Sequence, residues 1–340
     1  MAAGTERRFL PAGAMRRIVV LGAGRLAVTG AEFARGSGIA VEVFGAPRQA
    51  DARLPDGRSV VDALAALGAA PRYVESIRDC TGGPYDGPAD GAVILSLGSP
   101  FIIGQDLIDV YEGRVINSHG SLLPEWRGGG GFSWRILAGD RRGNSCFHLV
   151  TPGIDDGDVV LERAYTFPPK ARTPQEWMDY ALKQDAACLG ELLEGIRDGR
   201  TFAVRRQDEA RSTYFPRLDS HRQGYIDWSW PGEEIERFIL AFSHPYDGAK
   251  TFVGEQTVRL FDGYFSADSS HPHGFFHGLI LRASVDSLAV ACTGGMLTVA
   301  RAEIITDAEL KPGDRLVTPA ALLEEALRLR PRYTPKGLVA

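Results

Sequence analysis

Residues Arg17–Gly24, with the sequence RIVVLGAG, decide the fold class because they join an apolar run to a glycine turn. The run RIVVL predicts a buried strand, and the turn at Gly22–Gly24 leads into a helix around Val28–Ala34. A second strand is expected at Ala40–Phe44. Short apolar strands that alternate with helices are typical of βαβ units and therefore of a parallel sheet.

The same alternation continues along the chain to about residue 200. The expected elements are helices at Arg58–Leu67, Asp106–Tyr111 and Phe132–Ala138, and strands at Ala92–Ser96, Arg114–Asn117, Ser145–Val150 and Val159–Tyr165. A long helix then spans Thr173–Gly199, where Thr173 and Glu176 form a capping box. We therefore predict a Rossmann-like, mostly parallel α/β domain over residues 15–203.

The character of the chain changes after this helix. Residues 204–223 are polar and rich in arginine, which predicts a linker. Beyond it, one amphipathic helix at Pro231–Phe242 is followed by short strands with glycine turns, at Thr257–Phe261, Leu279–Arg282, Leu288–Cys292 and Leu297–Ala300. This pattern predicts a small antiparallel, OB-like β-barrel over residues 224–330. Residues 1–14 contain no apolar signal core, so we expect a disordered leader there.

The composition excludes several classes of protein. The 340 residues are 44% hydrophobic and 24% charged, and no apolar stretch reaches the roughly 18 residues of a membrane span. A formal net charge of −5 is not the footprint of a nucleic-acid-binding chain. The four cysteines lie far apart, which indicates reduced thiols in a cytoplasmic protein, and no clustered ligands predict a metal site.

The motif Gly22-x-Gly24-x-x-Ala27 has the form of a dinucleotide-binding turn. Such a site also needs an acidic residue about 20 positions further on, at the end of the second strand. Glu42 has the right spacing but lies in the middle of that strand, and the strand end Gly45-Ala46-Pro47 carries no acid. We therefore expect a turn for close strand–helix packing rather than a site for NAD or FAD.

The residues richest in chemistry lie in Arg114–Val160, RVINSHGSLLPEWRGGGGFSWRILAGDRRGNSCFHLVTPGIDDGDVV. Asn117 and His119 are separated by one residue at the carboxyl end of a strand, so both side chains can face the same side. Asp155 lies in a polar loop flanked by glycines. The three could supply an oxyanion donor, a proton carrier and its partner. A turn cap at Asn117 and solvated loop charges at Asp155, Asp156 and Asp158 stay open on the residues alone, whereas the EF-hand pattern of a calcium loop fails because no glutamate stands at its twelfth position.

At these positions the chain resembles the formyltetrahydrofolate-dependent formyltransferases, which include methionyl-tRNA, glycinamide ribonucleotide and amino-sugar N-formyltransferases. The resemblance rests on Asn117-Ser118-His119-Gly120-Ser121-Leu122-Leu123-Pro124, Arg127-Gly128, Trp134, Gly139, His148, Ile154-Asp155-x-Gly157-Asp158, Ile226-Asp227-Trp228-Ser229-Trp230-Pro231, Ala241-Phe242-x-x-Pro245-Tyr246-x-Gly248-Ala249 and Ala291-Cys292-x-Gly294-Gly295. The chain departs from the family where Gly131 replaces a frequent proline, which gives the run Gly128–Gly131, and where Cys146 replaces a threonine.

The resemblance implies an enzyme that takes a formyl group from N10-formyltetrahydrofolate, with Asn117, His119 and Asp155 as catalytic residues and no metal. It implies folate contacts at Phe101, Ile102, Ile103, Gly129, Thr151, Pro152, Gly153 and Ile154. An ordinary core role is the alternative for Phe101–Ile103. Ser121, Arg127 and Trp134 are the candidates for a substrate loop.

The charge of the second half favours a small acceptor over a nucleic acid. Residues 205–340 contain three lysines and 13 arginines against nine aspartates and nine glutamates, a net charge of −2. A tRNA-binding domain would be expected to offer a basic face. We therefore expect the acceptor to be the amine of a nucleotide-linked amino sugar. Methionyl-tRNA formyltransferase and a non-catalytic dinucleotide-binding or regulatory protein are the alternatives, and a homodimer is compatible with the sequence.

Overall fold

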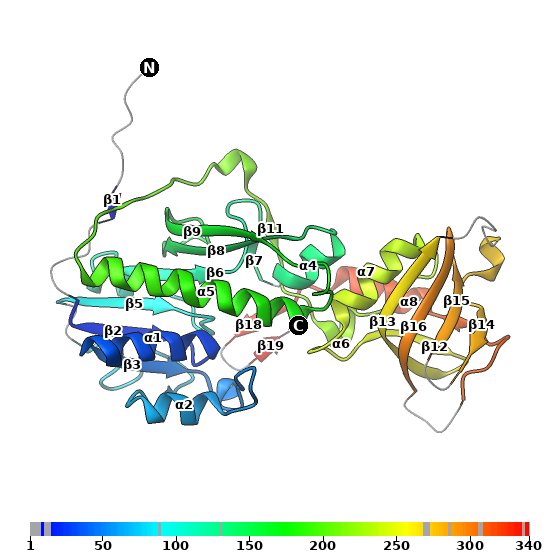
Figure 1. The fold of residues 1–340 in the computed structure, drawn as a ribbon, viewed down its shortest axis with the longest axis horizontal. Coiled ribbons are helices and arrows are strands. Elements are labelled where there is room, and N and C mark those ends of the chain that lie inside the picture. Colours follow the sequence, from blue (N-terminus) through cyan, green and yellow to red (C-terminus); the bar gives the residue numbers. More distant parts are fainter. Residues whose placement is uncertain are drawn as a thin grey trace, which may run out of the picture.

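The computed structural model describes residues 8–9, 15–87, 90–129, 131–267, 273–284, 287–304, 309–334 and 337–339. Figure 1 shows an α/β part and a β-barrel side by side, with α4 (Gly131–Leu137) and α7 (Gly232–Phe242) packed together where they meet. In these ranges no helix is both long and apolar enough to cross a membrane. The expected limits at residues 15–203, 204–223 and 224–330 stay a prediction.

The α/β part is built on a seven-stranded sheet with the order β4-β3-β2-β5-β6-β8-β9. Its strands are β2 (Arg17–Leu21), β3 (Ala40–Gly45), β4 (Arg72–Tyr73), β5 (Ala92–Ser96), β6 (Val115–His119), β8 (Arg142–Leu149) and β9 (Val159–Thr166). The strands from β4 to β6 are parallel, whereas β8 and β9 run antiparallel to their neighbours. This confirms the predicted Rossmann-like, mostly parallel sheet.

Helices cover both faces of this sheet, because its strands contribute side chains to two separate cores that helices complete. On one face, α1 (Arg25–Ser37), α2 (Val60–Ala66) and α5 (Pro174–Arg197) share a core with Ile18 and Val20 of β2. On the other face, α3 (Gln105–Val110) packs with Val19 and Leu21 of the same strand. The alternation of β2 side chains between two cores explains why its sequence is apolar throughout its central residues.

Two helix starts show how local sequence sets the boundaries. The hydroxyl of Thr173 accepts a hydrogen bond from the Glu176 N–H, and the Glu176 carboxylate accepts one from the Thr173 N–H at 2.9 Å, as the capping box predicts. Helix α2 begins at Val60 rather than at Arg58, because the Ser59 side chain caps it by accepting the N–H of Asp62.

Residues 201–223, called the connector below, are more ordered than a simple linker. They form β10 (Phe202–Ala203), a 3-10 turn, η2 (Glu209–Arg211), β11 (Tyr214–Phe215) and α6 (Ser220–Gln223). Strand β11 pairs in parallel with β7 (Arg127–Gly128), so the connector is hydrogen-bonded to the glycine-rich loop.

The start of the chain also contacts the connector. β1 (Arg8–Phe9) pairs with β10, and Phe9 is buried against Phe202. These two residues therefore differ from the expected disordered leader, because a buried aromatic ring holds them on the protein. The remainder of residues 1–14 lies outside the described residues.

The barrel is an antiparallel sheet with the strand order β14-β15-β16-β13-β12-β17. Its strands are β12 (Ala249–Val253), β13 (Gln256–Ala267), β14 (Ile280–Ala283), β15 (Leu288–Cys292), β16 (Gly295–Ile304) and β17 (Leu316–Val317). The Leu316 N–H donates to the Gly278 carbonyl and the Ile280 N–H to the Asp314 carbonyl, both at 2.8 Å, so the two ends of the sheet meet. This confirms the predicted antiparallel barrel.

The sequence prediction omitted several helices and strands in the second half of the chain. Strand β12 was missed because Lys250 interrupts its apolar pattern, although this side chain is buried and its ammonium lies over the Tyr225 ring. The prediction also omitted α8 (Ala320–Arg328) and the hairpin of β18 (Arg332–Thr334) and β19 (Gly337–Val339), which follow the barrel.

Candidate active site

Three polar side chains form a row across β5, β6 and β8. Asn117 stands opposite Ser96 in the parallel pair and opposite His148 in the antiparallel pair. The Ser96 hydroxyl donates to Asn117 Oδ1 at 2.7 Å, and Asn117 Nδ2 lies 3.0 Å from His148 Nε2. The amide group is thus oriented from both sides, with its N–H donors directed away from Ser96.

His119 faces the same side of β6, as the one-residue spacing predicts. Its Nε2 lies 2.7 Å from the Trp126 carbonyl and 2.8 Å from the Ser121 hydroxyl, which itself donates to the same carbonyl. A carbonyl only accepts hydrogen bonds, so we assign the proton of the neutral ring to Nε2. The unprotonated Nδ1 then faces Asp155 Oδ2 at 3.6 Å.

Asp155 reaches these side chains from a loop that folds back along β6. The loop leaves β8 beside the start of β6, where the Val150 N–H donates to the Val115 carbonyl. The Asp155 carboxylate nevertheless lies 3.5 Å from Asn117 Nδ2 and accepts a hydrogen bond from the Gly128 N–H at 2.9 Å. Asp155 has φ of 51°, a left-handed conformation that a non-glycine residue seldom adopts.

The electrostatics of the pair favour a charged carboxylate beside a neutral imidazole. Burial by itself would raise the pKa of Asp155, but the neighbouring His119 and His148 rings and the Gly128 N–H outweigh it and hold that pKa well below its usual range. Burial is also the main influence on His119, whose pKa it lowers below the ordinary value despite the opposing charge of Asp155. The result is a base with an unprotonated nitrogen next to an anion that stabilises its protonated form.

Glycines make this approach of chain segments physically feasible. Gly128 has φ of 94°, and a Cβ there would lie 2.4 Å from the Phe215 carbonyl oxygen. At Gly157 a Cβ would lie 1.8 Å from the Leu149 carbonyl oxygen. Two loops around the site therefore need residues without side chains. This accounts for Gly128 in the unusual glycine run, whereas Gly130 lies outside the described residues.

Three residues that contact Asn117 or the Asp155 loop were missed by sequence reasoning, namely Ser96, His148 and Gln207. His148 is part of the quoted family motif but was given no role; its Nε2 lies 3.6 Å from Asp155 Oδ1. Its position in a strand opposite Asn117 could have indicated this contact. Gln207 is buried and donates to the Asp155 and Gly157 carbonyls, both at 2.7 Å. It lies in the segment expected to be a linker, and no local signal could have indicated its contact with a loop about 50 positions earlier.

The three substrate-loop candidates are engaged inside the protein. Ser121 is buried on His119 and the Trp126 carbonyl. The Arg127 guanidinium is buried between Gln207 and Glu209, and the Trp134 indole N–H donates to the Pro216 carbonyl at 2.7 Å. The polar groups of all three hold neighbouring loops, and their contact with substrate stays a prediction.

The predicted folate residues divide into buried and exposed positions. Phe101 is buried and Ile103 packs beside it, as the alternative core role expects, whereas 90% of Ile102 is exposed. In the second loop, Thr151 donates to the Asp156 carboxylate, and Pro152, Gly153 and Ile154 are exposed. Gly129 packs against Arg217, where a Cβ would lie 2.2 Å from Cγ.

The turn at Gly22 is used for packing, as expected. Gly22 has φ of 116°, and a Cβ there would lie 2.4 Å from the Leu97 carbonyl oxygen. Glu42, the acid with dinucleotide-like spacing, forms an ion pair with Arg17 at 2.8 Å. The Gln49 side-chain oxygen accepts the Ala46 N–H at 3.1 Å and lies 3.4 Å from the Ala23 nitrogen. Glu42 is thus engaged with Arg17 of the neighbouring strand, and Gln49 contacts the main chain on either side of the turn.

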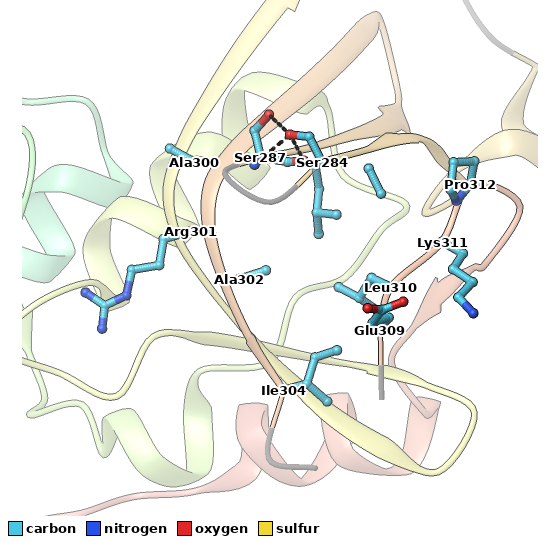
Figure 2. Close-up of a pocket in the computed structure, with 12 residues that line it drawn as sticks. Ser284, Ser287, Ala300, Arg301, Ala302, Ile304, Glu309, Leu310, Lys311 and Pro312 are labelled. Atoms are coloured by element: carbon cyan, nitrogen blue, oxygen red, sulfur yellow. Dashed lines mark hydrogen bonds between the residues drawn. The ribbon is translucent and has the colours of Figure 1, made fainter. Parts of the chain in front are cut away.

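The structure also contains a hollow of about 640 Å³ on the barrel, far along the chain from Asn117, His119 and Asp155. Figure 2 shows its wall of Ala300, Ala302 and Ile304 on β16, with the Arg301 side chain directed away from it. No predicted site residue lines this hollow. Within the described parts of the chain, no group of three or more His, Cys, Asp or Glu side chains is placed to hold a metal ion.

Comparison with known proteins gives two family matches. The family described as "Formyl transferase" matches residues 91–192, and "Formyl transferase, C-terminal domain" matches residues 220–314. A methionyl-tRNA formyltransferase of Anaeromyxobacter sp. is 31% identical over 219 residues, 63% of this chain and 67% of its own. One of Geotalea uraniireducens is 28% identical over 257 residues, covering 74% and 76%.

A solved structure shows the same fold. It is an N-formyltransferase from Helicobacter canadensis in complex with folinic acid and dTDP-3-aminofucose. The TM-score is 0.64 at 14% identity, and the match covers 85% of this chain and all of the other.

Proposed function

The chain belongs to the formyltransferase family, and from that premise we propose that it moves a formyl group from N10-formyltetrahydrofolate to the primary amine of a nucleotide-linked amino sugar. The observation that carries the chemistry is the meeting of Asn117, His119 and Asp155 on one side of β6. An amide donor, a neutral imidazole and an ionised carboxylate are the groups that a direct amine-to-acyl transfer requires.

The reaction forms one C–N bond and breaks another. The acceptor amine attacks the formyl carbon, the bond from that carbon to folate N10 breaks, and one proton passes from the amine to N10. The unprotonated Nδ1 of His119 takes that proton, and Asp155 stabilises the imidazolium that results. His119 then returns the proton to the leaving nitrogen.

Asn117 stabilises the negative oxygen of the tetrahedral intermediate. Its amide already has one close partner in His148, at 3.0 Å, and one distant partner in Asp155, at 3.5 Å. The longer contact is weaker, so we infer that its N–H turns to the oxyanion when substrate is present. Ser96 keeps the amide oxygen on the opposite side, where it cannot face the developing charge.

We place the flat pterin of the folate between the two loops that carry exposed apolar side chains. Ile102 and Ile154 are 90% and 59% exposed, although both belong to residue types that proteins usually bury. A planar ring that binds through apolar contacts and backbone groups would cover them. The likeness to a structure solved with folinic acid supports a folate as the formyl donor.

Ion pairs of the connector support a small acceptor. Three of its five arginines, Arg205, Arg211 and Arg222, pair with the carboxylates of Glu162, Glu125 and Glu325. A paired guanidinium gives up much of its attraction for the phosphates of an RNA backbone. The net charge of −2 over residues 205–340 supports the same interpretation.

Initiator methionyl-tRNA is the second candidate acceptor. It is favoured by the curated relatives, which are methionyl-tRNA formyltransferases. One of them matches about three quarters of this chain. Both acceptors present a primary amine to the formyl carbon, so the proposed chemistry at Asn117, His119 and Asp155 serves either one.

One assay distinguishes these acceptors. The protein is incubated with N10-formyltetrahydrofolate and, in separate reactions, with dTDP-, UDP- and GDP-linked amino sugars or initiator methionyl-tRNA, and the release of tetrahydrofolate is followed. We expect turnover with at least one amino-sugar nucleotide. The matched control is the same nucleotide sugar without the amine, which should give no turnover. Turnover with the tRNA alone would overturn the sugar assignment and leave formyl transfer intact.

A further inference from the structure

Gln207 of the connector holds the loop that carries Asp155. The side-chain amide donates to the main-chain carbonyls of Asp155 and Gly157, each at 2.7 Å. We propose that Gln207 is a positioning residue that sets the place of the Asp155 carboxylate without touching the reacting groups. The role in catalysis rests on the proposed function, whereas the clamp on the loop does not.

The orientation of this amide is fixed by Arg127. Gln207 Oε1 accepts hydrogen bonds from Arg127 Nε at 3.1 Å and Nη2 at 2.8 Å. A guanidinium has only donors, so the oxygen must face it and both amide N–H groups must face the loop. Glu209 in turn accepts from Arg127 Nη1 and Nη2 at 3.0 and 2.7 Å. The chain of contacts therefore runs Glu209, Arg127, Gln207 and then the loop.

The loop needs such a clamp because its backbone conformation is unfavourable. Asp155 is held at φ of 51°, a left-handed conformation that is unfavourable for a non-glycine residue. Gly157 beside it adds conformational freedom to the unclamped chain. Gln207 is buried, with 4% of its surface exposed, and all four of its hydrogen-bonding positions are occupied by protein partners. A side chain that only filled space would not need these four hydrogen bonds.

Two substitutions separate the clamp from simple packing. Gln207→Glu retains the size and the acceptor for Arg127 but removes both N–H donors, whereas Gln207→Met removes donors and acceptor together. Gln223→Met is the matched control, because Gln223 also lies in the connector and donates to a carbonyl, that of Ala326 on α8, away from the loop. Thermal melting identifies any variant that fails to fold.

Turnover is the first measurement. If the donors position Asp155, both Gln207 variants lose about 10- to 100-fold in kcat, with the KM for the acceptor changed less than about threefold. The acid side of the pH–kcat profile moves to lower pH, because a displaced Asp155 supports the proton on His119 less. His148 and Arg135 also influence His119 and are unchanged in these variants. Gln223→Met keeps the wild-type kcat and profile.

Hydrogen–deuterium exchange of residues 151–158 is the second measurement and needs no substrate. We expect faster exchange in both Gln207 variants than in the wild type or in Gln223→Met. A Gln207→Glu protein with wild-type kcat, pH profile and loop exchange would overturn the positioning role. Absence of turnover by the wild-type protein with every acceptor would count against the proposed function, while the exchange result would still decide the clamp.

Discussion

Asp155 and Asp185 are two carboxylic acids withdrawn from water in the same α/β part, yet their pKa values are shifted in opposite directions. Asp155 lies among His119, His148 and the Gly128 N–H. Asp185 lies on α5, and its carboxyl accepts a hydrogen bond from the Ser145 hydroxyl at 2.5 Å. Burial raises the pKa of Asp185 to about 6, the hydroxyl offsetting only part of the effect.

The difference shows that burial alone does not identify a functional carboxylate. Burial disfavours the charged form at both positions, and the number and charge of the partners decide the outcome. Groups from several segments of the chain surround Asp155 and keep its carboxylate ionised. The surroundings of Asp185, in contrast, leave a carboxyl group that is partly neutral near pH 6. Substitutions at these two regions should therefore affect different properties of the protein.

Asp155→Asn should have the largest effect on the comparison. The amide retains the shape but loses the charge that stabilises protonated His119, so we expect kcat to fall on the order of 10³-fold. Because the folded state holds the pKa of Asp155 below its usual range, the variant should also be less stable than the wild type at neutral pH. Steady-state folate release measures the loss. Asp140→Asn is the control, since Asp140 is a carboxylate paired with Arg142 away from the site. A kcat within tenfold of the wild type would remove Asp155 from the proposed mechanism.

Gly128→Ala tests the backbone partner of Asp155. The new Cβ would collide with the Phe215 carbonyl, so the N–H must move and we expect kcat to fall roughly 100-fold. Gly139→Ala is a matched control, because Gly139 also has a positive φ, of 66°, while the nearest atom to its Cβ is 3.7 Å away, on Arg237. Both variants should lose stability in a melting experiment, but only the first should lose turnover to this extent.

Ser96→Ala examines the support of Asn117 rather than that of Asp155. Loss of the 2.7 Å hydrogen bond leaves the amide free to rotate, so about a tenfold decrease in kcat is expected with an unchanged KM for folate. Ser133→Ala serves as the comparison, since Ser133 is equally buried and its hydroxyl donates to the Ala241 carbonyl. Equal losses in the two variants would point to general destabilisation instead.

Asp185→Asn should leave turnover unchanged and alter the pH dependence of stability. The folded-state pKa of about 6 exceeds the ordinary value of 3.8, so the native state of the wild type binds more protons and loses stability as pH rises through this interval. The variant lacks that loss and should be more stable at pH 7 by up to about 3 kcal/mol, the gain vanishing near pH 3. Urea unfolding at both pH values measures it.

The sequence predicted best the features that follow from the pattern of side chains along a single strand. Leu288–Cys292 and Arg17–Leu21 coincide with observed strands, because a buried strand reads as a continuous apolar run. Asn117 and His119 were placed together because alternate residues of a strand share a face. His148 lies beside Asn117 through the register of the β6–β8 pair, which alternation within one strand does not specify. Asp155 was indicated by its glycine-flanked loop and by the family motif.

What the sequence could not predict depends on contacts between distant segments. Gln207 is an ordinary glutamine in a polar stretch until the fold brings it against the loop of Asp155. Arg127 was expected to face substrate, and its burial on Gln207 and Glu209 requires the path of the connector to be known. Such tertiary hydrogen bonds leave no local periodicity or spacing.

The pairing of β11 with β7 has a consequence for anyone who recombines this protein with its relatives. A chimaera joined just after α5 would receive Tyr214–Phe215 and Gln207 from one parent and Gly128 with Asp155 from the other. A crossover placed after residue 217 instead would transfer the strand, the glutamine and its arginine partner as one inherited unit. The barrel is therefore exchangeable only when the path leading to it stays with the α/β half.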